Sequence, residues 1–243
     1  MAELASPRMP DAMHAAWMPG RLAQLLTDPC EPDPQDLLLH RPELADSVAQ
    51  MFAGLFEPAA RVMGDLWLAD DCEDWQVTLG MCRLLTLSHD VAAARTRRPA
   101  SSAQRSVLVV SQPGETHLLM AALHAELFWR AGWQVRQEAP TDDAELGDLV
   151  AGHGFDLLDI SLSAAYRRDD WLPRLARTVA RARAASSNDE LAVMVGGRRF
   201  YEDASAAARV GADRGCTESS ELPALAEALW QRASRCSEPP APH

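Results

Sequence analysis

The chain has 243 residues, 47% hydrophobic and 24% charged, enough for one large core or two modest ones. No apolar run approaches the roughly 18 residues that span a bilayer, and residues 1–21 lack the apolar stretch of a secretory signal, so we expect a cytoplasmic protein with no membrane partner. The formal net charge of −12 argues against direct, specific nucleic-acid binding, which needs clustered cations.

The N-terminal part is predicted to hold an arm and a helical domain. Residues 1–42 are rich in proline, which favours an extended or loosely packed arm. From residue 43 to about 94, apolar side chains recur at spacings of three and four, as helices with one buried face require, with an interruption at Pro58. We expect a small helical bundle over 43–98, merging into a polar linker at 97–104.

From residue 103 to 235, short apolar runs alternate with helical stretches. Strands are expected at 106–111, 133–137, 157–161, 191–195 and near Gly215, and helices at 117–131, 144–151, 170–185, 201–210 and 221–234. Five strands alternating with five helices predict a Rossmann-like (flavodoxin-like) α/β domain, whose parallel sheet is covered on both faces. Residues 236–243 are assigned to a C-terminal tail.

In such a sheet, ligands bind at the carboxyl ends of the strands, which here selects the loops at 111–117, 161–166, 196–200 and 216–219. In the first loop, Gly114 permits a tight turn. Glu115 and Thr116 suit a helix entry, where carboxylates and hydroxyls satisfy free backbone N–H groups. His117 then stands at the start of the helix, beside the crevice. A lone histidine in that place is usually an ordinary surface residue.

The motifs around these loops resemble a known family. The sequence VLVVSQPGETH at 107–117, Ser161-Leu162-Ser163 and Gly196-Gly197 are similar to the D-x-H-x-x-G, S-x-L and G-G hallmarks of cobalamin-binding domains. The resemblance implies that His117 is the lower axial ligand of cobalt, and that the corrin's displaced base enters the sheet core as a tail. Glu115 would fix the tautomer of the imidazole, and the paired glycines would let backbone approach the tail.

Two positions depart from the family pattern. Met120 stands at the family's glycine position, where it would narrow the tail channel, and Ser163 replaces the leucine of S-x-L. Both changes bear on cofactor affinity and on whether adenosyl-, methyl- or hydroxocobalamin is bound.

The helical segment carries a second resemblance. Gly64-Asp65-Leu66-Trp67 is similar to the helical cap of corrinoid methyl carriers and cobalamin photoreceptors, in which a tryptophan covers the upper face of the ring. A core tryptophan is the equally open alternative. Where adenosylcobalamin photoreceptors have a Glu-His pair, this chain has Val77-Thr78. Instead, WLADDCEDWQVTLGMCRL (67–84) and GGRRFYEDASAAARVGAD (196–213) look like the AerR/PpaA anti-repressors of purple bacteria and the SCHIC domain of AppA.

Other candidate ligands are weaker. His89 falls late in the last predicted cap helix and would be an alternative upper ligand, whereas His124 and His153 sit in no recognisable constellation. The acidic run at 70–74 lacks the alternating ligands and the glycine of a calcium loop.

The predicted function is a cobalamin-binding, light-responsive transcription regulator rather than an enzyme. By the resemblance, it acts as an anti-repressor on a transcriptional repressor protein in photosynthesis or tetrapyrrole gene control. Two alternatives stay open: a corrinoid methyl carrier of a methyltransferase system, and a haem-binding redox or light sensor, because His117 would serve either metal. A mutase is disfavoured because the chain has no room for a substrate barrel of about 250 residues.

Overall fold

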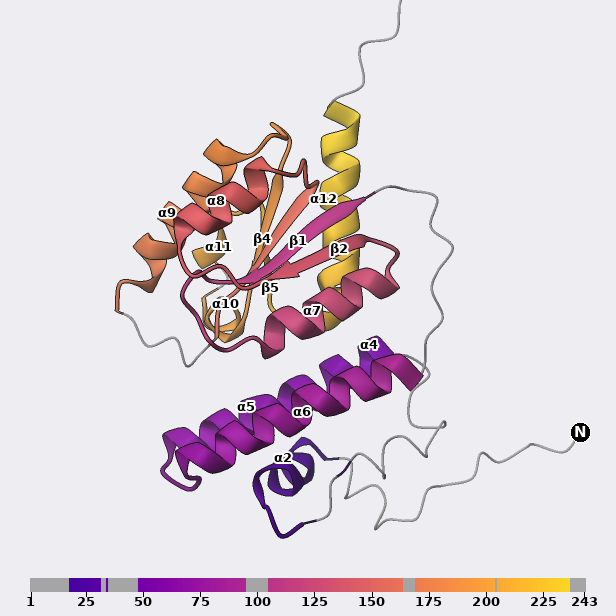
Figure 1. Cartoon of the computed structure of the whole chain (residues 1–243), viewed down its shortest axis with the longest axis vertical. Helices are drawn as coiled ribbons and strands as arrows, with labels where there is room; N and C mark the ends of the chain where they lie inside the picture. Colours follow the sequence, from indigo (N-terminus) through magenta and orange to yellow (C-terminus); the bar gives the residue numbers. More distant parts are fainter. Residues whose placement is uncertain are drawn as a thin grey trace, which may run out of the picture. The chain divides into compact units, whose positions relative to one another are not determined.

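The computed structural model describes residues 18–31, 34, 48–94, 105–163, 169–203 and 205–236. The chain divides into two compact units, residues 1–95 and 96–243, and each is described by itself (Figure 1). The linker predicted at 97–104 lies outside the described residues, as does the predicted tail beyond Cys236.

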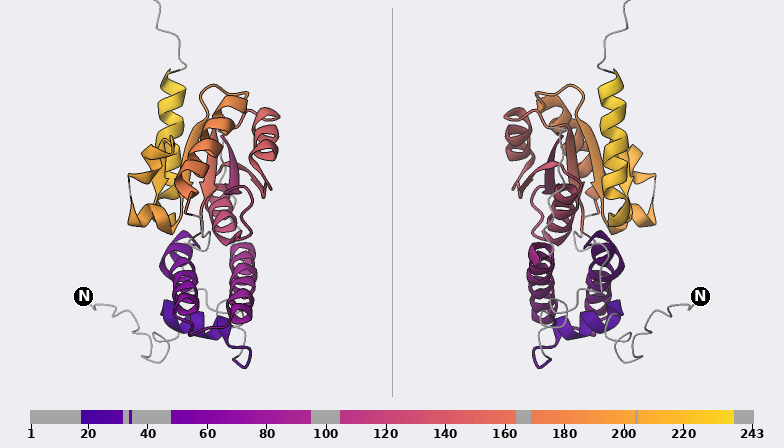
Figure 2. Two further views of the ribbon diagram at one scale, coloured as in Figure 1. Left: turned by 90° about the vertical axis from the view of Figure 1, so that its left-hand side faces the viewer. Right: turned by 90° about the vertical axis from the view of Figure 1, so that its right-hand side faces the viewer.

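The first unit is a small helical bundle. Its elements are α2 (Pro19–Thr27), α4 (Val48–Met51), the π-helical turn η2 (Phe52–Phe56), α5 (Glu57–Leu68) and α6 (Asp74–Ala94). Helices α5 and α6 lie side by side, and α2 packs against both (Figure 2). The side chains that fill this core are fully buried: Leu22, Leu26, Phe52, Phe56, Met63, Leu84 and Leu87.

Helix α2 corrects the predicted arm. We expected residues 1–42 to be extended or loosely packed, but residues 19–27 are helical and bury Leu22, Leu25 and Leu26. Pro19 does not prevent this helix, because a proline in the first turn lacks only an N–H group that has no intrahelical partner there. The proline-based prediction is therefore wrong for this segment.

The prediction that Pro58 interrupts the helical run is also wrong. The chain stays helical from Val48 to Leu68, with a π-helical turn directly before the proline. In that turn the N–H of Glu57 bonds to the carbonyl oxygen of Phe52, five residues back. Pro58 is thus the second residue of the α-helical segment α5, and the π-helical turn before it accommodates its missing N–H.

Two residues of α6 fasten α2 to the bundle. A Cβ atom on Gly80 would lie 2.6 Å from the sulfur of Met63 and 3.0 Å from the methyl of Thr27, so a larger residue would force the Met63 side chain to shift. Arg83 Nη1 donates to three carbonyl oxygens at the end of α2, at 3.1 to 3.4 Å: those of Leu25, Leu26 and Asp28. Gly80 and Arg83 both belong to the run that resembles the anti-repressor cap, so packing accounts for this part of the resemblance.

We expect Arg83→Ala to lower the free energy of unfolding of the first unit by about 1 to 3 kcal/mol, because the carbonyl groups at the end of α2 lose a charged donor. Urea unfolding, together with hydrogen exchange of the α2 amides, measures this. The control is Arg21→Ala, which removes only a surface ion pair with Glu31 and should cost less than about 1 kcal/mol. Equal effects of the two changes would contradict the anchoring role.

The second unit is built on a five-stranded parallel sheet. Its strands are β1 (Ser106–Ser111), β2 (Gln134–Glu138), β3 (Leu157–Ser161), β4 (Ala192–Gly196) and β5 (Arg214–Cys216), in the order β2-β1-β3-β4-β5 (Figure 1). This is the flavodoxin-like order, and the predicted fold class is confirmed. The strand order reverses between β1 and β3, which makes their carboxyl ends the switch point of the sheet.

Helices cover both faces of this sheet. One face carries α7 (Leu119–Arg130) and α12 (Leu222–Cys236), the latter preceded by the short turn η3 (Ser219–Glu221). The other carries α8 (Asp143–Ala151) and α9 (Trp171–Ala185), with α10 (Arg198–Glu202) and α11 (Ala206–Arg209) (Figure 2). The single helix predicted at 201–210 is therefore wrong. The carboxylate of Asp203 binds the N–H and hydroxyl of Ser205 and so competes with helical bonding between the two short helices.

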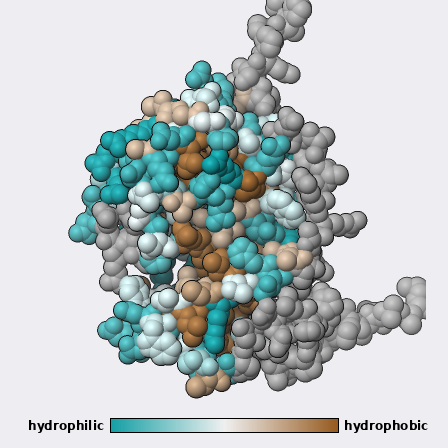
Figure 3. Space-filling view, viewed as in Figure 1, coloured by the Kyte–Doolittle hydropathy of each residue, from teal (hydrophilic) through white to brown (hydrophobic). Residues whose placement is uncertain are grey.

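Alternate residues of the strands face opposite layers. Leu108, Val110, Ile160 and Val195 belong to the core under α8 and α9, so their neighbours in sequence face α7 and α12. The outer side of α8 and α9 is mainly hydrophilic (Figure 3). Within the described residues, none of the helices combines the length and apolar character that a bilayer crossing requires.

Candidate functional site

The switch point brings together the loops that follow β1 and β3. Ser111 and Ser161, the last residues of these strands, are in register, and their hydroxyl oxygens lie 3.4 Å apart. The N–H of Gln112 donates to the carbonyl oxygen of Ser161 at 2.9 Å. The first loop is thus tied to β3 at the place where flavodoxin-like folds bind their ligands.

Glu115 joins the two loops and holds His117. Its side chain is only 1% exposed; Oε1 lies 3.2 Å from Nδ1 of His117, and Oε2 accepts a hydrogen bond from the N–H of Ser163 at 3.1 Å. The hydroxyl of Ser111 donates to the carbonyl oxygen of His117 at 3.2 Å. The His117 side chain is 47% exposed; the buried carboxylate of Glu115 orients Nδ1, and no described residue hydrogen-bonds to Nε2.

The predicted helix entry is two residues too early. Helix α7 begins at Leu119, its N-cap Leu118 makes no side-chain cap, and Thr116 is exposed. Glu115 caps no helix, because the bond from its N–H to the carbonyl oxygen of Gln112 closes a turn that directs its carboxylate toward the β3 loop. The role predicted for Glu115 and Thr116 at the helix entry is therefore wrong.

The hydrogen bond that protonated His117 donates to Glu115 raises the pKa of His117 above its ordinary value of 6.5. Partial burial of the ring works in the opposite direction, and the charge of Glu115 adds to the rise. Because the pKa is raised in the folded protein, the stabilisation from protonated His117 is fully present below the pKa of the unfolded chain. It is lost as the pH rises through the pKa of the folded state.

We expect Glu115→Gln to lower the pKa of His117 in the cofactor-free protein back toward 6.5, because the amide can still bond to Nδ1 but carries no charge. A titration of the His117 ring protons by NMR measures this. As a control, Glu145→Gln removes a carboxylate that bonds to Thr141 and should leave the His117 titration unchanged. An unchanged pKa in Glu115→Gln would show that another group holds the imidazole.

Gly114 shapes the same loop. Its φ is 81°, a left-handed conformation that favours glycine, and its N–H donates to the carbonyl oxygen of Pro140 at 3.1 Å. A Cβ atom there would lie 3.2 Å from the carbonyl oxygen of Thr141. The turn thus brings the β1 loop close to the segment between β2 and α8.

The paired glycines serve the protein's own packing. At Gly197, where φ is 122°, a Cβ atom would lie 2.1 Å from the carbonyl oxygen of Leu162. At Gly196 it would lie 3.1 Å from Cε1 of His124 and 3.4 Å from the carbonyl oxygen of Cys216. By the family resemblance, these glycines would let backbone approach a cofactor tail, and this stays a prediction. In the structure, their missing side chains accommodate the carbonyl oxygen of Leu162 and the ring of His124.

His124 forms a buried pair that the motifs did not reveal. Its Nδ1 lies 2.7 Å from Oδ2 of Asp159, and the two side chains are 1% and 0% exposed. Oδ1 of Asp159 has no hydrogen-bond partner among the described residues. One signal was available: Asp159 is the only charged residue in the apolar strand LLDIS, and His124 follows His117 by about two helical turns.

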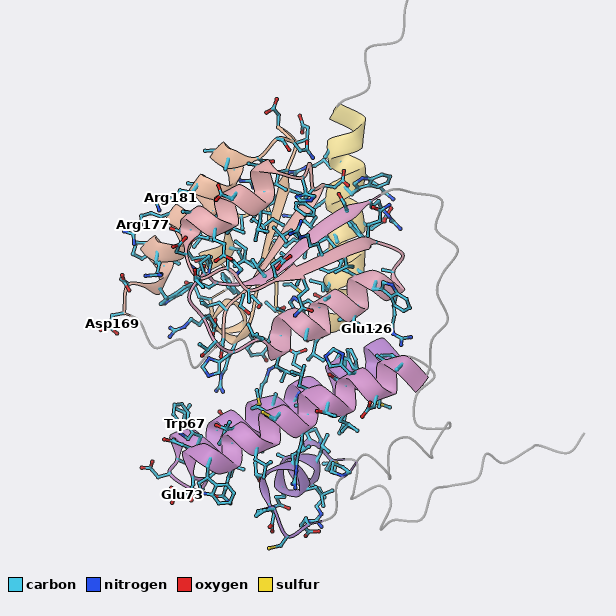
Figure 4. The ribbon with its side chains drawn as sticks, in the orientation of Figure 1. Trp67, Glu73, Glu126, Asp169, Arg177 and Arg181 are labelled. Carbon is cyan, nitrogen blue, oxygen red and sulfur yellow. The ribbon has the colours of Figure 1, made fainter. Side chains whose placement is uncertain are left out.

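A second buried contact fixes the β1 loop from the other face. Gln112 Nε2 donates to the hydroxyl of Thr178 in α9 at 2.9 Å, and that hydroxyl donates to Asp143 at 2.7 Å. On the same helix, Arg177 and Arg181 project outward (Figure 4). Sequence reasoning missed Gln112, because nothing in the local pattern showed that α9 would supply its partner.

The remaining motif positions differ in their surroundings. Met120, the second residue of α7, is half-buried, whereas Leu162 is fully buried in the core under α8 and α9. Ser163 takes part in the site through its backbone N–H, which any residue except proline would supply. Serine in place of the family's leucine at this position therefore leaves the contact with Glu115 intact.

Trp67 and Val77 belong to the first unit. Trp67, near the end of α5, is half-buried, and its indole N–H donates to Asp74 (Figure 4). Val77 is half-buried on α6, and His89 is exposed on the same helix. No three His, Cys, Asp or Glu side chains of the described residues gather as a metal site would require, the acidic turn at 70–74 included. The assignment of Trp67 to a ring's upper face stays a prediction.

Fold and site together define a flavodoxin-like α/β domain with a carboxylate-held histidine at its switch point. No family model matches the chain. The chain is 29% identical over 167 residues to an uncharacterized 20.5 kDa protein from the bchF–crtJ intergenic region of Rhodobacter capsulatus, a match that covers 68% of this chain and 84% of that protein.

Among solved structures, the monomethylamine corrinoid protein of Methanosarcina barkeri matches with a TM-score of 0.65 and 12% identity, over 90% of this chain and 97% of that one. The chain therefore has the fold of a corrinoid protein. A cobalamin-binding protein from Desulfitobacterium hafniense is 16% identical, over 87% of this chain and 98% of that one, but its TM-score of 0.43 is too low to support an argument.

Proposed function

We propose that this chain binds a corrinoid, with His117 as the lower ligand of cobalt, and that it acts as a light-responsive anti-repressor rather than as an enzyme. The observation that carries the proposal is Glu115, whose buried carboxylate holds His117 and Ser163 at the β1/β3 switch point. The fold, which is that of a named corrinoid protein, supports it.

The chemistry of His117 fits this cofactor. Metal-bound imidazoles usually have their second ring nitrogen hydrogen-bonded to a carboxylate, which fixes the tautomer and raises the basicity of the ligand. Glu115 holds Nδ1 in this way, and the half-exposed ring leaves Nε2 for the metal. One histidine suffices as protein ligand where a macrocycle supplies the equatorial nitrogens. When bound, the corrin would supply absorption of visible light and an exchangeable upper ligand.

Three observations support a regulatory role. The gene of the relative in Rhodobacter capsulatus lies between bchF and crtJ, in a photosynthesis gene region. The net charge of −12 disfavours direct binding of DNA, which needs a basic surface, and so favours action through a protein partner, for which we propose a repressor. By the resemblance of the first unit, Trp67 would cover the upper face of the ring, so that a change of upper ligand would alter its contacts.

Reconstitution tests the proposal. The full chain is mixed with hydroxo-, methyl- or adenosylcobalamin, or with haem, and its absorption spectrum is recorded after gel filtration, in the dark and after illumination. We expect retained cobalamin with its own base displaced, and a spectrum that light changes. A repressor protein should co-purify with the chain in one light condition only. Failure to retain any cobalamin would contradict the proposal.

A corrinoid methyl carrier is the second candidate function. It is favoured because this chain has a fold similar to that of the monomethylamine corrinoid protein over 90% of its length. The two functions separate when the chain is loaded with methylcobalamin. A carrier passes the methyl group to an acceptor in the dark, whereas a light-responsive regulator keeps it until illuminated. The similar proteins named above give no support to the haem alternative, and the haem arm of the reconstitution tests it directly.

A further inference from the structure

A row of small residues crosses the sheet at its carboxyl edge. Ser111, Ser161, Gly196 and Cys216 pair in register from β1 through β3 and β4 to β5. Their neighbours Val110, Ile160 and Val195 face α8 and α9, so this row faces α7. By the resemblance of the motifs, it is where a corrin's displaced nucleotide tail would enter the core.

Side chains of this chain already fill the space above that row. His124 reaches from α7 to the sheet, with Cε1 3.1 Å from the position of a Cβ on Gly196, so that not even a methyl group fits without a shift. Asp159 stands one pleat below Ser161, on the same face, and binds Nδ1 of His124. The two side chains are 1% and 0% exposed, and Ser111 and Ser161 are also buried.

The pair resists displacement. Moving His124 aside would break its hydrogen bond and leave the carboxylate of Asp159, which has one oxygen already without a partner among the described residues, in a core shielded from water. An entering tail would have to replace that bond. A ribose hydroxyl of the tail could compensate for the lost bond by donating to Oδ1 of Asp159. In that case the tail would enter the core, which is the outcome that competes with a closed core.

The site of the ring is separate from this pair. Glu115 and His117 lie in the loop before α7, and Glu115 bonds to His117 and to the β3 loop, without contact to His124 or Asp159 in any hydrogen bond among the described residues. The ring ligand can therefore be in place while the core stays closed.

On the basis of the proposed function, we propose that His124 and Asp159 close the sheet core to the nucleotide tail. The chain then holds a corrinoid by its ring through His117 and leaves the tail in solvent. The ligand class widens accordingly: tailless corrinoids such as cobinamide are bound as well as complete ones. To bind His117, an alkylcobalamin must first break the bond between cobalt and its own base, and no contact of the tail with the protein offsets this cost. A tailless corrinoid has no such bond to break, so it is bound more tightly.

The test compares methylcobalamin with methylcobinamide, which share the ring and the upper ligand, on the full chain. Dissociation constants are measured by absorption titration in the dark. We expect methylcobinamide to bind more tightly than methylcobalamin. Tighter binding of methylcobalamin, by about tenfold or more, would show that the tail enters the core and would overturn the inference.

Two further measurements locate the closure. In bound methylcobalamin, the proton resonances of the displaced dimethylbenzimidazole should titrate as they do in the free nucleotide, because the base is in water; resonances that do not titrate would contradict this. His124→Ala should shift the affinity ratio toward methylcobalamin. An unchanged ratio in folded His124→Ala would overturn the role of His124, and if that variant does not fold, the comparison on the unaltered chain decides.

The outcomes separate the inference from the proposed function. Binding of neither corrinoid, or binding that His117→Ala does not weaken, contradicts the proposed function. Binding of both corrinoids through His117, but with methylcobalamin clearly preferred, contradicts the closed core alone.

Discussion

His117→Ala is expected to lose cobalamin during gel filtration, with an affinity at least about 100-fold below that of the unaltered chain, because loss of the ligand itself should cost no less than loss of a group that supports it. The absorption spectrum of the remaining mixture should be that of cobalamin with its own base bound. Binding titrations in the dark with hydroxo- and methylcobalamin measure both effects.

The matched control is His153→Ala. His153 is exposed in the same unit, bonds to Arg136 and stacks against Phe155, so its removal changes the histidine content without touching the switch point. Its cobalamin affinity should equal that of the unaltered chain. Equal retention by both variants would assign the cobalt ligand to another residue and remove the central support of the proposed function.

Gly197→Ala is expected to lower the free energy of unfolding of the second unit by about 2 to 4 kcal/mol, because φ at this position is 122° and the added Cβ would lie 2.1 Å from the carbonyl oxygen of Leu162. The loss combines backbone strain with a clash against backbone that cannot move without separating β3 from β4. Urea unfolding followed by circular dichroism measures it.

Gly147→Ala serves as the control for this change. Gly147 lies inside α8, where a Cβ would make an ordinary contact of 3.6 Å with the Cβ of Ala185. The substitution should stabilise the unit by about 0.5 to 1 kcal/mol, because alanine loses less conformational freedom in a helix than glycine does. Destabilisation of similar size in both variants would mean that Gly197 holds no special conformation.

The two glycine motifs show how a family resemblance and a structural role can rest on the same residues. Gly196 and Gly197 carry part of the likeness to cobalamin-binding domains, yet their missing side chains accommodate His124 and the carbonyl of Leu162. In α6, Gly80 and Arg83 carry part of the likeness to the anti-repressors and fasten α2. In both places the motif residues have a packing role in the structure, whereas Glu115 and His117 form a polar pair at the switch point of the sheet.

The alternation of strands and helices along the second unit followed from the sequence, except that the helix predicted at 201–210 is two short helices. Short apolar runs separated by helical periodicity predicted five parallel strands, and β1 and β3 have the predicted bounds. Such prediction succeeds because alternation and helical spacing are local consequences of which faces are buried. The same reasoning placed His117 beside the crevice, because loops after parallel strands share one edge of the sheet.

Only the tertiary structure decided what each of these residues touches. Glu115 meets Ser163, 48 residues away, because β1 and β3 are neighbours in the sheet, and His124 meets Asp159, 35 residues away, because α7 crosses that face. Local spacing carries no information on strand order or on helix placement, so the sequence predicted a carboxylate at a helix entry and assigned no role to His124. The fold instead placed the carboxylate between two loops and paired His124 with Asp159 in the core.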